Sequence, residues 1–152
     1  MAGGSREHNT ITSNIATQLQ TRLRGSGCQV FVSDMKVRVE TDNVFNYPDV
    51  VVTCNSQDTE KLFLTKPCLI VEVLSLSTEN IDRRERLLTY KKIEDLQEYV
   101  LVSQDEIKVE LYRKDRDNNW IKYILGKDDL IILNSVNLQL TMTEVYEDVL
   151  NV

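Results

Sequence analysis

Two apolar runs that each carry one carboxylate place the strongest constraint on how this chain can fold. Residues 49–54 read DVVVTC and residues 68–74 read CLIVEVL. Aliphatic and β-branched residues dominate both runs, as they do in strands that are buried on both faces of a sheet. An acidic side chain in such a strand is costly unless it is paired or bound to a metal. We therefore expect a functional site around Asp49 and Glu72.

The two acids can meet if the two runs form neighbouring strands. Asp49 then begins one strand, and Glu72, which shares a face with Ile70 and Leu74, stands near the end of the other. Carboxylates held together in this way bind Mg²⁺ or Mn²⁺, and the carbonyl of Val73 is a candidate for a further ligand. The structural alternative is that the aspartate is an ordinary turn residue after a proline and the glutamate faces solvent at a sheet edge.

A basic helix is predicted over residues 79–93, directly after the second run. Serine and threonine at residues 77–78 can cap it, and Tyr90 belongs to its buried stripe. Asp82 and Tyr90 are also candidates for supporting residues of the site. Arg86 has two interpretations. It is either a cation that stabilises charge on a phosphate, or the partner of Asp82 in an ordinary helix ion pair.

The remaining sequence predicts helices around a mixed sheet. Apolar residues recur every four positions from Ile11 to Leu23 and indicate an amphipathic helix over residues 8–24, which Gly25 ends. His8 lies just before that helix. For a lone histidine, a role as a surface or capping residue is favoured over a role as a supporting residue of the site. Residues 1–7 are expected to be disordered. Further strands are expected over residues 28–33 and 35–40, as neighbours, and over residues 98–103, 107–113, 120–125 and 130–133, with a last helix over residues 144–150.

This order of elements predicts one α/β domain of 152 residues, with a mixed sheet flanked by helices and a C-terminal antiparallel hairpin. No apolar run approaches the roughly 20 residues that span a membrane. The N-terminal residues carry no apolar stretch typical of a secretion signal, so a cytoplasmic location is expected. Cys28, Cys54 and Cys68 form an odd set without a closely spaced pair, which favours reduced, buried thiols.

The net charge of −6 argues against a general attraction to nucleic acid. It does not exclude a nuclease, because such a site needs local acids for a metal and only a local basic stripe for phosphate. Arg83, Lys91 and Lys92 are candidates for contacts with a nucleic-acid backbone, although a solvated helix face is the commoner role of such residues.

Several motifs, in this order, resemble those of the Uma-two family of restriction endonucleases in the PD-(D/E)xK nuclease superfamily. They are YPDVV at residues 47–51, LIVEVLS at residues 69–75, ST at residues 77–78, DR at residues 82–83 and EYVLV at residues 98–102. The likeness extends from about His8 to Val149. It implies a restriction-endonuclease-like core in which Asp49 and Glu72 are the metal carboxylates. It also implies Mg²⁺ or Mn²⁺ as cofactor and DNA as partner, and by analogy a homodimer, since cleaving both strands of a duplex favours two sites.

The sequence departs from the family pattern in three places. The superfamily often has a lysine two residues after the second acid, where this chain has Leu74. The Uma-two pattern moves the lysine onto the following helix, and the matching residue here is Arg86, which cannot release a proton. Family members also usually carry additional residues before the first helix.

Three functions are consistent with these observations. The leading hypothesis is Mg²⁺-dependent hydrolysis of DNA phosphodiester bonds, with Asp49 and Glu72 on the metal and Arg86 on the phosphate. The second is a catalytically impaired family member that acts as a nucleic-acid or protein binding module, which Arg86 and the short N-terminus favour. The third is a structural or interaction protein without nucleic-acid contacts, which the acidic net charge favours.

Overall fold

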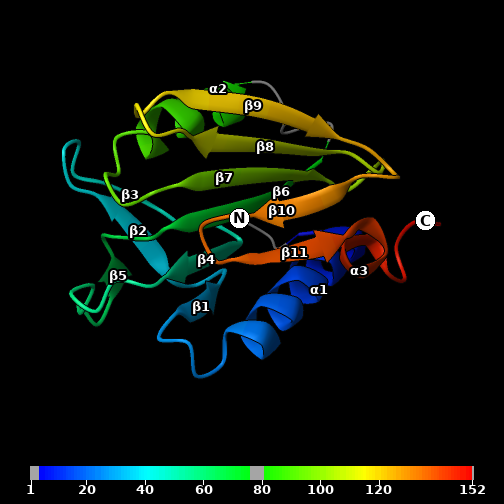
Figure 1. Ribbon diagram of the computed structural model, residues 1–152, viewed down its shortest axis with the longest axis horizontal. Helices are drawn as coiled ribbons and strands as arrows, with labels where there is room; N and C mark the ends of the chain where they lie inside the picture. The colour runs from blue at the N-terminus through cyan, green and yellow to red at the C-terminus, as the bar shows by residue number, and fades with distance from the viewer. Residues whose placement is uncertain (1–3, 76–80, 152) are drawn as a thin grey trace.

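The computed structural model describes residues 4–75 and 81–151, and for residues 81–84 it describes the backbone alone. In this part of the chain it contains three helices and eleven strands (Figure 1). The helices are α1 (Arg6–Leu23), α2 (Ile81–Tyr90) and α3 (Met142–Tyr146). The strands are β1 (Gln29–Val32), β2 (Lys36–Val39), β3 (Val44–Asn46), β4 (Val50–Thr53), β5 (Phe63–Leu64), β6 (Leu69–Leu74), β7 (Glu98–Ser103), β8 (Val109–Lys114), β9 (Trp120–Leu125), β10 (Leu130–Leu133) and β11 (Leu138–Thr141).

A six-stranded mixed sheet forms the centre of the molecule, in the order β1-β4-β6-β7-β8-β9. Only β6 and β7 are parallel among these neighbours, and α2 lies between them in the chain as the crossover that a parallel pair requires. The strands β3-β2-β5 form a small second sheet, and β10 and β11 form a hairpin. The mixed sheet with helices and a C-terminal antiparallel strand pair confirms the predicted fold class.

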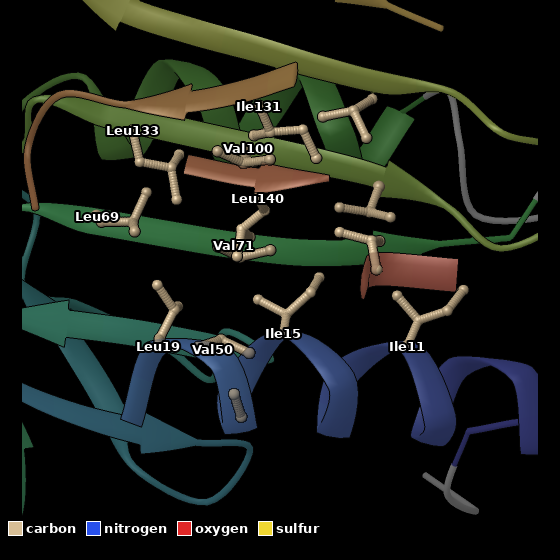
Figure 2. Close-up of a cluster of buried hydrophobic side chains, with 14 of the residues drawn as sticks. Ile11, Ile15, Leu19, Val50, Leu69, Val71, Val100, Ile131, Leu133 and Leu140 are labelled. Carbon is tan, nitrogen blue, oxygen red and sulfur yellow. The ribbon is translucent and has the colours of Figure 1, made fainter. Parts of the chain in front are cut away.

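One face of the central sheet packs against α1, α3 and the hairpin. Side chains from α1, including Ile11, Ile15 and Leu19, meet Val50 and Val71 of the sheet, and β10 and β11 complete the cluster (Figure 2). The apolar residues of α1 fall on one stripe because they recur at helical spacing. This stripe packs α1 against the sheet.

The opposite face of the central sheet is covered by the small sheet and by α2. Val37 and Val39 of β2 and Tyr90 of α2 belong to one buried cluster with Val51 and Ile70 of the central strands. The side chains on this face belong to the odd positions of β4 and the even positions of β6, which is the face expected to carry the two acids. The small sheet and α2 therefore lie over the same side of the sheet as Asp49 and Glu72.

The helix α1 begins earlier than the sequence predicts. It starts at Arg6, and Ser5 is its N-cap, whose side chain accepts a hydrogen bond from the backbone N–H of His8. Residues 6 and 7, which belong to the segment expected to be disordered, lie in this helix. The predicted stop at Gly25 is confirmed, since its φ of 79° lies in the left-handed region that glycine tolerates.

The predicted pairing of residues 28–33 with residues 35–40 is wrong. The strand β1 pairs with β4, whereas β2 pairs with β3 and β5 in the small sheet. Ser33, with a φ of 36°, lies in the turn that separates the two strands. The partners β3 and β5 lie in segments that local composition identifies as a polar turn and a polar loop.

The prediction of three reduced thiols is also wrong, because Cys28 and Cys54 form a disulfide. The antiparallel register pairs Gln29 with Thr53, so the next position brings the two cysteines opposite each other, with their Cα atoms 4.1 Å apart. Cys68 remains a thiol, with its Sγ 3.6 Å from that of Cys54. Burial raises the pKa of Cys68 to about 11, so it is protonated at neutral pH.

Within the described residues, no helix combines the length and the apolar character needed to cross a membrane.

Candidate functional site

The antiparallel pairing of β4 and β6 brings the two predicted acids together. Val50 is paired with Val71, so the next step of the same register sets Asp49 opposite Glu72. The backbone N–H of Val73 donates a 2.8 Å hydrogen bond to Asp49 Oδ2, which fixes the aspartate across the strand pair. The negative charge of Asp49 is one of the influences that raise the pKa of Glu72, in keeping with their proximity. Val73 thus contacts the site through its N–H in this structure, where the sequence suggests its carbonyl.

Asp49 is held by the first turn of α1 as well as by β6. His8 Nε2 lies 3.1 Å from Asp49 Oδ1, and the two side chains are 26% and 19% exposed. The hydrogen bond with Asp49 raises the pKa of His8, while burial acts in the opposite direction. His8 takes part both in helix capping and in the site. Its backbone N–H donates a hydrogen bond to the side chain of the capping residue Ser5, and its ring contacts Asp49, the candidate metal ligand.

Glu72 is a buried carboxylate with three side-chain donors around it. Its side chain is 2% exposed, and Tyr99 donates a 2.6 Å hydrogen bond to Oε2. Arg86 Nη1 lies 3.0 Å from Oε1, and the Tyr90 hydroxyl lies 3.5 Å from the same oxygen. Burial raises the pKa of Glu72, and Arg86 and Tyr99 oppose this effect. The structure excludes the interpretation of Glu72 as a solvent-facing edge residue.

Two tyrosines hold the glutamate from α2 and β7. The rings of Tyr90 and Tyr99 meet edge to face, with their centroids 5.3 Å apart. Burial and the charge of Glu72 raise the pKa of both hydroxyls, so they stay protonated and act as donors. Sequence analysis identified Tyr90 as a supporting residue but not Tyr99. The available signal was a tyrosine directly before the aliphatic residues 100–102 of β7.

The cations predicted on the basic helix have different surroundings. Arg86 contacts Glu72, and its side chain is 42% exposed to solvent. Lys92, just beyond α2, contacts Asp42 in the turn between β2 and β3, with 2.8 Å between Nζ and Oδ2. Lys91 also follows α2 directly and is half-buried. The side chains of Asp82 and Arg83, and residues 77–78, which were expected to cap the helix, lie outside the described part of the chain.

The donor set suits a hard divalent cation held by few protein ligands. Mg²⁺ is commonly bound through one or two carboxylates while it keeps several waters. Asp49 and Glu72 supply that number of carboxylates on neighbouring strands. In residues 4–75 and 81–151 no cluster of three or more His, Cys, Asp or Glu side chains is arranged to hold a metal. His8 and Arg86 each contact an oxygen of the pair, so a metal bound here competes with these two side chains.

Comparison with known proteins gives consistent results. The family model Uma2, described as "Putative restriction endonuclease", matches residues 1–143. Two uncharacterized proteins from Synechocystis sp. are each 35% identical to this chain. One aligns over 147 residues, or 96% of this chain and 77% of the relative, and the other over 124 residues, or 80% and 70%.

A solved structure has the same fold. It is the crystal structure of a protein from Anabaena variabilis described as "a putative nuclease belonging to DUF820". The two structures superpose with a TM-score of 0.81 at 18% identity, over 97% of this chain and 84% of the other. At this level of identity the likeness concerns the architecture, and the side chains of the site have to be judged on their own chemistry.

Proposed function

Because this chain belongs to the Uma2 family of restriction-endonuclease-like proteins, we propose that it is a metal-dependent nuclease that hydrolyses phosphodiester bonds in DNA. The observation that carries this proposal is the register of β4 and β6, which sets Asp49 beside the buried Glu72. A buried acid kept near a second acid is unfavourable for stability alone and is typical of functional sites. The half-exposed Arg86 next to this pair supplies a positive charge for a phosphate.

In this proposal Asp49 and Glu72 hold Mg²⁺ or Mn²⁺ through their carboxylate oxygens. A bound divalent metal supplies charge neutralisation for a phosphodiester and lowers the pKa of a bound water. Tyr99 fixes the orientation of Glu72 through its 2.6 Å hydrogen bond, and the Val73 N–H does the same for Asp49. His8 binds a proton more tightly than a free histidine does, so it is a candidate proton donor beside the site.

Arg86 has a second role in the proposal, as a contact for phosphate. The arginine guanidinium is a planar group with five N–H donors, and it recognises phosphate in a bidentate manner. One nitrogen of Arg86 is engaged with Glu72, while the side chain is 42% exposed. The group is therefore placed to contact the acid and a substrate phosphate together. It cannot act as a base, because arginine stays protonated in proteins.

The alternative is a member of the family that binds nucleic acid or protein without cleaving a substrate. The ion pair between Arg86 and Glu72 favours this alternative, because it occupies an oxygen that a metal would need. Leu74 is consistent with it as well, since that position gives no cation to the site. Metal binding and DNA cleavage therefore need to be measured separately.

A homodimer belongs to the same proposal, because two sites are needed to cut both strands of a duplex. The edge strand β9 carries three exposed large apolar residues, Ile121, Tyr123 and Ile124, which suit pairing with a second copy. Light scattering should then give twice the mass of the chain, and Ile124→Lys should give the mass of one chain. A single-chain mass for the wild-type protein would exclude this arrangement. The cytoplasmic location stays a prediction.

The decisive experiment combines calorimetric titration of Mn²⁺ with nicking of supercoiled DNA. Asp49→Ala and Glu72→Gln should abolish both metal binding and nicking. Glu85→Ala, which removes an exposed acid of α2, is the matched control and should retain both. Metal binding without nicking in the wild-type protein would support the binding-module alternative. Absence of metal binding at millimolar Mn²⁺ would exclude the metal-dependent nuclease.

A further inference from the structure

The outer face of the small sheet carries two aromatic rings and two cations in a compact arrangement. We define the aromatic–cation surface as Lys36, Arg38, Phe45 and Phe63. Arg38 is paired with Phe45 across β2 and β3, and Lys36 is paired with Phe63 across β2 and β5. The rings lie edge to face with centroids 5.6 Å apart. Lys36 Nζ lies 5.0 Å from the Phe45 ring centroid, and Arg38 Cζ lies 6.0 Å from that of Phe63.

These four side chains are not needed to cover the core. The alternate residues of β2, Val37 and Val39, are 0% and 1% exposed and make the inward contacts of the small sheet. Phe45 by contrast is 43% exposed, and the adjoining Leu62 is 74% exposed. Large apolar groups gathered on the outer face of a sheet, with cations among them, are characteristic of a binding surface.

The aromatic–cation surface is joined to the candidate metal site by a short stretch of chain. Asp49 follows Phe45 by four residues, so their Cα atoms are at most about 14 Å apart. Tyr47, which lies between them, is 58% exposed. The ion pair between Lys92 and Asp42 also ties the β2–β3 turn to the segment after α2. A polymer that reaches Asp49 and Glu72 can therefore extend onto this surface.

We propose that the aromatic–cation surface binds unpaired nucleotides of the DNA that enters the site, with Phe45 stacking on a base and Lys36 and Arg38 contacting phosphates. The inference rests on the proposed function, which makes nucleic acid the substrate. Aromatic rings and interspersed cations are the groups with which proteins bind single-stranded nucleic acid without sequence preference. A base inside a duplex does not offer its face to Phe45, so this surface selects frayed, looped or single-stranded DNA. Because the net charge of the chain is negative, phosphates are attracted only in the immediate neighbourhood of these cations.

The test is binding measured by fluorescence anisotropy without divalent metal and at low salt, about 50 mM. Two labelled probes of about 20 nucleotides are compared, an oligothymidylate and an abasic oligonucleotide with the same number of phosphates. Both probes are longer than the roughly 4–16 nucleotides that a small stacking site covers. The wild-type protein should prefer the oligothymidylate by about 5- to 150-fold, the range that stacking of one base gives. Phe45→Ala and Phe45→Leu should both abolish this preference, and Phe45→Leu keeps the apolar bulk if the alanine variant folds poorly.

The cations and a remote residue provide the controls. Lys36→Gln and Arg38→Gln should each reduce the slope of log affinity against log salt by about 0.7, the value for one phosphate contact with a single strand. Leu130→Ala, which removes a similarly exposed apolar side chain from β10, should leave the preference unchanged. Equal wild-type affinity for the two probes would overturn the proposal, as would a preference that survives in both Phe45 variants.

The outcome for this surface is separable from that for the nuclease proposal, because the binding assay contains no metal. Preference for the oligothymidylate that depends on Phe45, in a protein that never nicks DNA, would support the surface and exclude the nuclease. Nicking by a protein without this preference would support the nuclease and exclude the surface. A wild-type protein that binds neither probe and never nicks DNA would exclude both. Tighter binding of a matched duplex than of the oligothymidylate would overturn the assignment to unpaired nucleotides.

Discussion

Arg86 Nη1 lies 3.0 Å from Glu72 Oε1. The guanidinium is thus the positively charged partner of a carboxylate that is only 2% exposed. Burial raises the pKa of Glu72, and the guanidinium is the strongest influence in the opposite direction. The ion pair thus favours the charged form of Glu72, but it uses an oxygen that a metal would bind. Arginine and metal therefore compete for the same acid.

This competition predicts that Arg86→Gln binds Mn²⁺ more tightly than the wild-type protein does. A half-exposed ion pair contributes about 1 kcal/mol, so the gain should be roughly fivefold. Calorimetric titration at pH 8 is the appropriate measurement, because loss of Arg86 also raises the pKa of Glu72 and the acid has to be ionised. Weaker Mn²⁺ binding by Arg86→Gln would show that the arginine supports the metal site instead.

The contact between His8 and Asp49 predicts a specific titration. His8 is the single histidine of the chain, so one imidazole signal in an NMR titration reports on it alone. Its pKa should lie above the usual value near 6.5 in the wild-type protein and fall to or below that value in Asp49→Asn, because burial still lowers it. Saturating Mg²⁺ should lower it as well, because the metal replaces the proton beside Asp49. A His8 pKa that Mg²⁺ leaves unchanged would argue against metal at Asp49.

The same contact has a consequence for stability with a defined sign. Because the pKa of His8 is raised on folding, its stabilisation is fully present below about pH 6.5 and is lost as the pH rises through the folded-state value. The wild-type protein should exceed His8→Gln by about 1 kcal/mol at pH 6, with a smaller difference at pH 9. Urea denaturation of both proteins at the two pH values measures this change. A constant difference would show that packing, not charge, is responsible.

The two tyrosines around Glu72 form a matched pair for mutation. The Tyr99 hydroxyl lies 2.6 Å from Oε2, whereas the Tyr90 hydroxyl lies 3.5 Å from Oε1. A hydrogen bond to a charged group contributes about 1.5–3 kcal/mol, so Tyr99→Phe should lower the free energy of unfolding by this amount. Tyr90→Phe should cost well under half as much. Equal losses measured by urea denaturation would mean that the two hydroxyls bind Glu72 equally well.

The disulfide predicts a loss of stability on reduction. Cys28 and Cys54 are separated by 26 positions, and closing a loop of this size is expected to stabilise the folded state by about 3 kcal/mol. Reduced wild-type protein and Cys28→Ser should therefore unfold at similarly lower urea concentrations. Cys68→Ser is the control and should still respond to the reductant. Alkylation of three thiols in the untreated, denatured protein would contradict the disulfide.

The sequence was sufficient to predict most strands of the central sheet, because these strands follow patterns that burial imposes on each residue. In the central sheet, β7 matches its predicted residues 98–103 and β9 matches residues 120–125, and β10 of the hairpin matches residues 130–133. The proximity of Asp49 and Glu72 could be predicted, because two continuous apolar runs are best buried when they form neighbouring strands inside one sheet. These are features that a few consecutive residues determine.

The small sheet could not be predicted in the same way. The segment before Tyr47 contains Asp42 and Asn43, which are common turn residues, so local composition favours a turn. The strand β3 forms there only because β2 lies alongside it, and β5 is a two-residue strand with the same dependence. Local composition gives no information about such partners.

Local sequence patterns also could not identify the side chains that contact the two acids. Glu72 is bonded by Tyr99 from a different strand, and Asp49 is bonded by His8 from the first turn of α1. These contacts join residues that are far apart in the chain, and tertiary packing alone brings them together. The acids themselves were predictable because a charge in an apolar strand is conspicuous, whereas a tyrosine or histidine is compatible with many surroundings.

The disulfide turns part of the chain into a covalent ring. The ring runs from Cys28 to Cys54 and encloses β2, β3 and Asp49, together with Phe45 of the aromatic–cation surface. A protease that nicks the exposed turn at residues 41–43 would add one water to the mass and release no fragment. The two pieces would separate only after a reductant is added. The piece that carries both acids of the site and Phe45 thus stays joined to the piece that carries Lys36 and Arg38 after the backbone is cut.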